Sequence, residues 1–133
     1  MSLVRLATAL RTLAPAAGIA VYEGEAPSGA MAPWLVLSLE SPQSIEGEST
    51  TLPAGVYDWR VTVAGDTYAQ CLGWIGEVAR TWRNARVEVP GYSIGSLRGP
   101  DVTGPYKAGL TATDTNLRYQ VAQARFSLTV SEI

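Results

Sequence analysis

The chain of 133 residues contains no histidine, the side chain that most often serves as a general base in enzymes and as a metal ligand. Its single cysteine, Cys71, excludes an internal disulfide and a cysteine-rich zinc site, and its place in a helical apolar pattern predicts a buried thiol. The acidic residues lack the spacing of a calcium-binding loop, although the sequence neither supports nor excludes a catalytic pair of carboxylates. We therefore expect no metal, no cofactor and no enzyme activity.

Long hydrophobic runs are also absent, because no stretch approaches the roughly 20 apolar residues that cross a bilayer. The first five residues lack the long apolar core of a secretory signal, and Arg11 interrupts any extension of it. We expect synthesis in the cytoplasm and no contact with a membrane. A single domain over residues 1–133 is long enough to bury a core and too short for two.

Basic residues are missing from a long N-terminal stretch, since no lysine or arginine lies between Arg11 and Arg60. The acidic residues of that stretch are Glu23, Glu25, Glu40, Glu46, Glu48 and Asp58. An anionic surface repels phosphate backbones, so we expect no sequence-independent nucleic-acid binding there.

Two glycine-containing motifs resemble a catalytic motif and a phosphate-binding motif, but the surrounding residues do not fit either one. Residues 91–95 match the G-x-S-x-G nucleophile elbow around Ser93, but no histidine can activate that serine and no long helix can follow it. Gly99 and Gly104 have the spacing that opens a phosphate-binding loop, but Pro105 removes an amide where phosphate would need one. A small hydrolase or ligand-binding domain centred on Ser93 remains only as an alternative.

The most informative segment, residues 56–83, passes from a strand into a helix. Tyr57, Trp59, Val61 and Val63 alternate with polar residues, which predicts a strand with one buried face.

Ala64 and Gly65 are expected to form the turn after this strand, and Asp66 to cap a helix that begins at about Thr67. An apolar stripe on this helix, with Leu72 as one of the residues that fix the core, should lie on the sheet; its members are Tyr68, Leu72, Ile75, Val78, Ala79 and Trp82.

Gly73 and Gly76 weaken this helix by roughly 1 kcal/mol each relative to alanine. They therefore predict a close neighbour, either the first helix or another subunit.

The other expected elements complete an α+β domain with a largely antiparallel sheet, two helices packed on it and long irregular loops. Leu3, Leu6, Leu10 and Leu13 predict an N-terminal helix that Pro15 ends. Strands are expected at 19–22, 34–40, 85–90 and from 121 almost to the C-terminus, and loops at 23–33, 41–55 and 91–109. The aromatic residues beside loops are equally suited to a core and to an interface, and they are Trp34, Tyr92, Tyr106 and Tyr119.

This arrangement resembles the tail terminator, or tail-completion, proteins of long-tailed bacteriophages. The resemblance covers nearly the whole chain and rests on four segments: the leucine pattern of residues 3–13, the strand at 33–37, the strand at 57–63 running into the capped helix, and the strand at 125–130.

The resemblance implies a structural virion protein of the tail or neck, made in the host cytoplasm, that forms a six-fold ring. Such a ring caps the tail tube, ends tail elongation and presents the surface to which the head joins. Its implied partners are further copies of the chain, the tail tube protein and head-tail connector or neck proteins, while DNA passes through the lumen without specific binding. Another neck component, such as a head-completion or stopper protein, is the alternative within the same virion.

Strand edges and the loops at 41–55 and 91–115 are the expected contact regions of such a ring. Glu46 and Glu48 are the hypothesised acidic lining of the lumen. The candidate interface residues are Glu46, Glu48, Thr50, Trp34, Tyr92, Arg98, Asp101, Tyr106 and Lys107.

Overall fold

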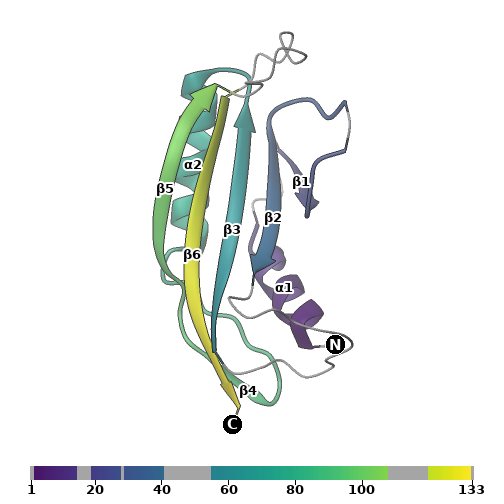
Figure 1. Cartoon of the computed structure of the whole chain (residues 1–133), viewed down its shortest axis with the longest axis vertical. Helices are drawn as coiled ribbons and strands as arrows, with labels where there is room; N and C mark the ends of the chain where they lie inside the picture. Colours follow the sequence, from purple (N-terminus) through teal and green to yellow (C-terminus); the bar gives the residue numbers. More distant parts are fainter. Residues whose placement is uncertain (1, 15–18, 28, 41–54, 108–119, 133) are drawn as a thin grey trace.

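The computed structural model describes residues 2–14, 19–27, 29–40, 55–107 and 120–132. Figure 1 shows a long, twisted sheet with both helices on one side of it. In chain order the elements are α1 (Ser2–Thr12), β1 (Ala20–Glu23), β2 (Trp34–Glu40), β3 (Gly55–Gly65), α2 (Tyr68–Trp82), β4 (Tyr92–Ile94), β5 (Arg98–Lys107) and β6 (Gln120–Glu132). The fold is α+β, as the sequence predicts.

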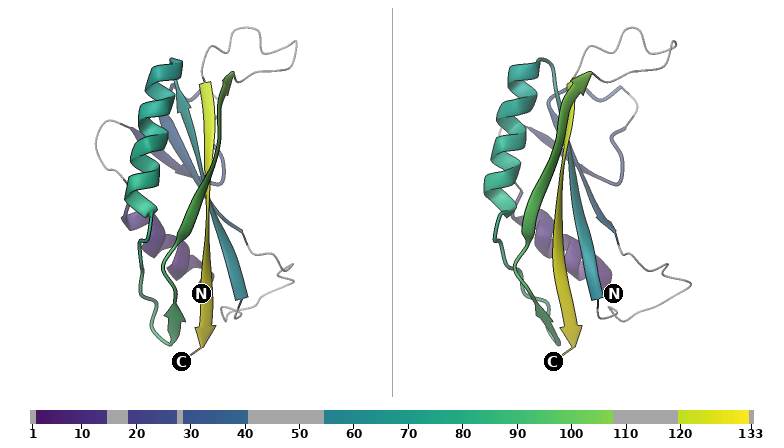
Figure 2. Two further views of the ribbon diagram at one scale, coloured as in Figure 1. Left: turned by 90° about the vertical axis from the view of Figure 1, so that its left-hand side faces the viewer. Right: turned by 60° about the vertical axis from the view of Figure 1, so that its left-hand side comes forward.

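The sheet is antiparallel except at one edge, where β1 runs parallel to β2. The strands follow the order β1-β2-β3-β6, and β4 and β5 pair with successive stretches of β6. In both views of Figure 2 the two helices stay on the same side of the sheet. The opposite side, on which the described residues form no helix, is called the helix-free face below.

The predicted alternation in β3 is confirmed, because Tyr57, Trp59, Val61 and Val63 are all buried beneath the helices. Register carries the pattern to both neighbours: Val61 pairs with Leu37 of β2 and with Ala124 of β6. Burial of these apolar side chains drives the sheet and helices together. The remaining members of this core from β2 and β6 are Leu35, Ala122, Phe126, Leu128 and Val130.

The strand-to-helix junction differs from the sequence prediction by one residue. Gly65 still belongs to β3, and Thr67 rather than Asp66 is the N-cap, with its hydroxyl accepting from the Gln70 amide at 3.1 Å. The Gln70 side chain accepts in turn from the Asp66 amide at 2.6 Å, which resembles a capping box. Aspartate and threonine both suit an N-cap, so composition alone could not choose between them.

Half of the predicted stripe on α2 is correct. Ile75, Val78 and Trp82 are buried, and Cys71 is buried with them as expected, its thiol lying 3.8 Å from the Val63 carbonyl oxygen. The buried face of α2 is narrower than the predicted stripe, and it is centred on the side of the helix that carries Cys71. The other three predicted members lie outside the buried core: Ala79 is half-buried, Tyr68 is 57% exposed and Leu72 is 47% exposed.

The first helix packs through Leu6 and Leu10, both fully buried, whereas Leu13 follows the end of the helix and is 39% exposed. Trp82 ties the two helices together, since its indole N–H donates to the Leu10 carbonyl oxygen at 3.0 Å. The first helix is not the predicted close neighbour of Gly73 and Gly76, because among the described residues a Cβ added at either position meets nothing within 4 Å. A neighbouring subunit at these glycines stays a prediction.

The segment after α2 also departs from expectation. Residues 85–90 do not form the predicted strand, although Val87 and Val89 are buried; Ala85 accepts a backbone hydrogen bond from Leu97 at 2.8 Å instead. Part of the loop expected at 91–109 is ordered as β4 and β5. Glycine and proline disfavour strands, so the local sequence concealed β5, whose pairing with β6 is a long-range interaction.

Gly65 holds β3 and α2 at a distance that no side chain permits, which predicts a large effect of Gly65→Ala. The added Cβ would lie 2.6 Å and 2.8 Å from the backbone nitrogen and Cα of Cys71. Because backbone atoms must move, we expect a loss of about 1–3 kcal/mol in the free energy of unfolding. Chemical denaturation measures it, with Gly73→Ala as the matched control: its site is open, so it should gain up to about 1 kcal/mol. Equal effects of the two substitutions would contradict the close approach.

Burial, and secondarily the neighbouring Tyr92, raises the pKa of Tyr57 above its ordinary value of 10.0. The neutral phenol therefore contributes stability that is complete below pH 10.0 and is lost as pH rises through the higher folded-state pKa. We expect the free energy of unfolding to fall less steeply above pH 10.0 in Tyr57→Phe than in the wild type. Burial also raises the pKa of Cys71, but this thiol is common to both proteins and cancels in the comparison. Parallel pH profiles would count against this role of Tyr57.

Candidate interaction surface

The helix-free face brings together four of the predicted interface residues from separate parts of the chain. Trp34 pairs with Ala64, Tyr106 with Val121, Asp101 with Arg125 and Arg98 with Ser127, and all of these point away from the helices. Side chains alternate between the two faces of a strand, and on β3 and β6 the core residues alternate with the partners of these four residues. The four residues and their partners therefore lie on the face opposite the core.

The other predicted interface residues do not join them. Tyr92 pairs with Glu132, so it belongs to the helix side of the sheet. Lys107 ends β5, and nothing is described of its side chain. Glu46, Glu48 and Thr50 lie outside the described residues.

One end of the helix-free face is apolar. There Trp34 is half-buried, Val36 is 9% exposed and Tyr106 is 43% exposed. Ala64 and Val121 complete the row that joins Trp34 to Tyr106 across the sheet. An aromatic residue at each side of an apolar row is a composition that favours protein contacts.

The other end of the face is charged and forms two cross-strand rows, defined here as the charged end. The upper row runs Ser38, Arg60, Arg125, Asp101 across β2, β3, β6 and β5, and the lower row runs Glu40, Asp58, Ser127, Arg98. Apart from the charges at Arg98 and Asp101, no interface was predicted at these positions. The alternation in β3 and β6 was visible in the sequence, but only the register places their charges side by side.

Few of these charges are neutralised within the chain. Arg60 donates to the Glu40 carboxylate at 2.8 Å, yet its buried Nε finds no hydrogen-bond partner among the described residues. Within the described part of the chain, Asp58, Arg98, Asp101 and Arg125 form no ion pair, although all four line one groove of about 260 Å³. Arg60 and Arg125 are direct cross-strand partners, an arrangement of like charges that is unfavourable in isolation.

The outer edge of the sheet at β5 is interrupted twice by the same device. Between Arg98 and Asp101, and again between Thr103 and Tyr106, one extra residue interrupts the register with β6. Each irregularity contains a glycine with positive φ followed by a proline, at Gly99-Pro100 and Gly104-Pro105. Bulges and prolines are the features by which edge strands avoid pairing with another chain.

The opposite edge is β1, which has only four residues. Its Glu23 carboxylate lies 3.6 Å from the Arg11 guanidinium of α1, and both side chains are about half exposed. A short, charged edge offers little backbone for strand addition. The two edges therefore favour contacts through faces and loops over contacts through strand pairing.

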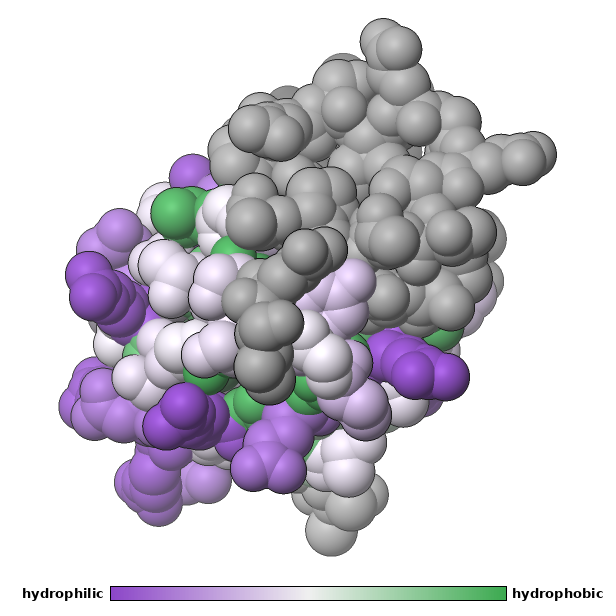
Figure 3. Space-filling model, turned by 90° about the horizontal axis from the view of Figure 1, so that it is seen from below, coloured by the Kyte–Doolittle hydropathy of each residue, from purple (hydrophilic) through white to green (hydrophobic). Residues whose placement is uncertain are grey.

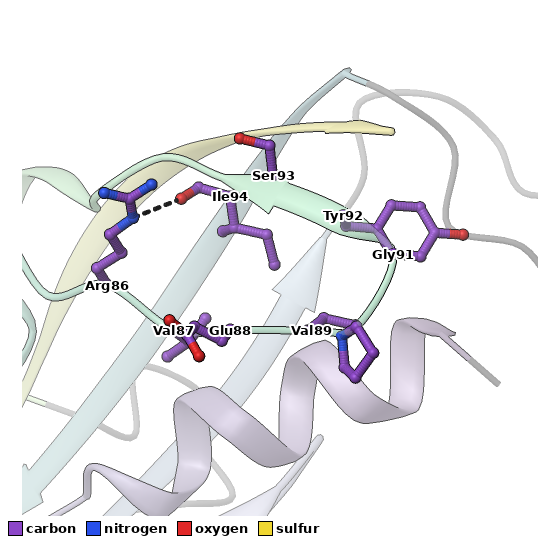
Figure 4. Close-up of a pocket in the computed structure, with 9 residues that line it drawn as sticks. Arg86, Val87, Glu88, Val89, Gly91, Tyr92, Ser93 and Ile94 are labelled. Carbon is purple, nitrogen blue, oxygen red and sulfur yellow. Dashed lines mark hydrogen bonds between the residues drawn. The ribbon is translucent and has the colours of Figure 1, made fainter. Parts of the chain in front are cut away.

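A cavity of about 680 Å³ surrounds the segment 86–94. Figure 4 shows that Ile94 points into this loop, whereas the Ser93 hydroxyl points away from it; the Arg86 Nε donates to the Ile94 carbonyl oxygen at 3.2 Å. Ser93 lies in the middle of β4 and not at a strand-to-helix turn. All the described residues that line this cavity come from one continuous segment, so no other described element contributes a side chain to it.

Seen from the end of the molecule where the C-terminus lies, the described surface is mostly hydrophilic, and hydrophobic residues show only as small separate patches (Figure 3). No group of three or more potential metal ligands occurs among the described residues. In the same residues, no helix is long and apolar enough to cross a membrane.

Compared with models of known protein families and with characterised proteins, the chain matches none. The case for a function therefore rests on the geometry of the helix-free face and on the order of the elements.

The β5 bulges depend on glycine, and Gly104→Ala tests this. Gly104 has φ +90° and Gly91 has φ +87°, but only at Gly104 would a Cβ collide, 2.7 Å from the Val121 carbonyl oxygen. We expect Gly91→Ala to cost about 1–2 kcal/mol from backbone conformation alone and Gly104→Ala to cost about 1–3 kcal/mol more. Thermal or chemical unfolding measures the difference. Equal losses would show that β5 does not approach β6 this closely.

Proposed function

We propose that the protein is a structural component of a tailed-phage virion, a tail terminator that forms a ring on the end of the tail tube. In this role it ends tail elongation and provides the surface for head-tail joining. Its partners are further copies of itself, the tail tube protein and the neck proteins. DNA passes through the ring, with Glu46 and Glu48 as the proposed acidic lining.

The observation that carries this proposal is the helix-free face. Among the described residues, a sheet with strands of up to 13 residues keeps one face without helices, although that face carries the half-buried Trp34 and the exposed ring of Tyr106. Aromatic side chains are enriched at protein interfaces, so a sheet face that presents them suits the contacts of an assembly component.

Two further features support an assembly role. The order helix, strands, helix, strands matches the arrangement on which the resemblance to tail terminators rests. In addition, the Ser93 hydroxyl points away from the cavity beside it, and burial raises the pKa of the Cys71 thiol, which disfavours the reactive thiolate.

The purified protein is expected to form rings. Six copies of the 14.1 kDa chain amount to about 85 kDa, and light scattering with negative-stain images would report both the mass and the annular shape. A ring that appears only on addition of tail tubes also supports the proposal. A protein that stays monomeric at every concentration and with tubes present would overturn it.

Deletion from a phage that encodes the chain identifies the position in the virion. A terminator predicts tails that are overlong or do not join heads, and complementation by the wild-type chain should restore them. Normal tails with leaking heads would move the role to a head-completion or stopper protein. Ser93→Ala serves as the control for the hydrolase alternative, because complementation should be unaffected; a failure despite a normal fold would favour chemistry at Ser93.

A further inference from the structure

The charged end of the helix-free face carries equal numbers of opposite charges in an ordered pattern. On β3, Arg60 of the upper row and Asp58 of the lower row have opposite signs, and on β5 the same is true of Asp101 and Arg98. On β2 and β6 the charged residues, Glu40 and Arg125, each share their strand with a serine of the other row.

This pattern is complementary to itself under one two-fold rotation. If two copies stack face to face about an axis that lies across the strands, between the two rows, each upper-row residue meets the lower-row residue of the same strand. Arg60 then faces Asp58 of the other copy, and Asp101 faces Arg98. Arg125 meets the Ser127 hydroxyl and Glu40 meets the Ser38 hydroxyl, so every charge finds an opposite charge or a hydrogen-bonding group.

The alternative axis, parallel to the strands between β3 and β6, gives a different result. It would place Arg60 of each copy against Arg125 of the other, and like charges facing each other across an interface are strongly unfavourable. The charge pattern therefore selects one orientation.

We propose that a second copy of the chain docks on the charged end through this two-fold, isologous contact. The positions flanking the charged rows are compatible with it: Val56, which is 48% exposed, would meet Thr62, and Thr129 would meet Gln123. Of the charged side chains involved, Arg98, Asp101 and Arg125 are exposed, and Asp58 and Arg60 are half-buried.

This contact is independent of the proposed ring. A ring requires a heterologous contact between different surfaces, whereas an isologous contact closes after two copies. The inference would stand in a protein with another function, and a ring could form without it. Because the contact is made mainly by exposed charges, it should weaken as salt rises and screening increases.

Two charge reversals test the contact together. In Arg98→Asp the two facing positions on β5 are both acidic in each copy, and in Asp101→Arg they are both basic. Each variant alone should dimerise at least about tenfold more weakly than the wild type at low salt, because both facing pairs repel. An equimolar mixture should dimerise like the wild type, since each acidic pair then faces a basic pair. Analytical ultracentrifugation measures all three, with circular dichroism as a check on folding.

The matched control reverses charges on the opposite side of the molecule. Glu77 and Arg80 form an exposed ion pair on α2 at 3.0 Å, so Glu77→Arg and Arg80→Glu change the net charge equally. Both control variants should dimerise like the wild type. A monomeric wild type at low salt, or a mixture that stays as weak as its components, would overturn the proposal. Six-fold rings without two-fold pairs would contradict the proposed two-fold contact but would still support the proposed function.

Discussion

The pairing of β3 with β6 is the constraint on which the rest of the structure depends. These strands are paired along the whole of β3, and their buried residues form the sheet surface on which α2 packs. Trp82 of α2 lies between Trp59 and Phe126, with ring centroids 5.9 Å and 6.3 Å away. Among the described residues the buried Trp59 indole N–H has no partner, which costs about 1–3 kcal/mol, and packing of these large rings outweighs that cost.

The same register also decides which side chains lie on the helix-free face. Because side chains alternate along a strand, the residues between the core positions must point to the helix-free face. A slip of one residue would exchange the core for the charged end, and burying Arg60 and Arg125 would be very costly. The core therefore fixes which residues the candidate interaction surface carries, even though the two share no side chain.

Elements with strict periodicity could be predicted from the sequence. The strand Trp34–Glu40 has the expected bounds, and β3, α2 and β6 lie where alternation or helical spacing places them. Local patterns failed where two residues suit the same role, as with Asp66 and Thr67, or where pairing overrides propensity, as in β5. The charged end was beyond local patterns altogether, because Arg125 becomes a neighbour of Arg60 and Asp101 only through long-range register.

The bulges of β5 connect the edge of the sheet to its charged face. Arg98 and Asp101 are three residues apart, so in a regular strand they would point to opposite faces. The extra residue at the Gly99 bulge returns Asp101 to the side that carries Arg98, and the Gly104 bulge does the same for Thr103 and Tyr106. A device that discourages strand pairing at the edge thus also places opposite charges, and then an aromatic ring, on the helix-free face. The same two glycines therefore shape both the edge of the sheet and its helix-free face.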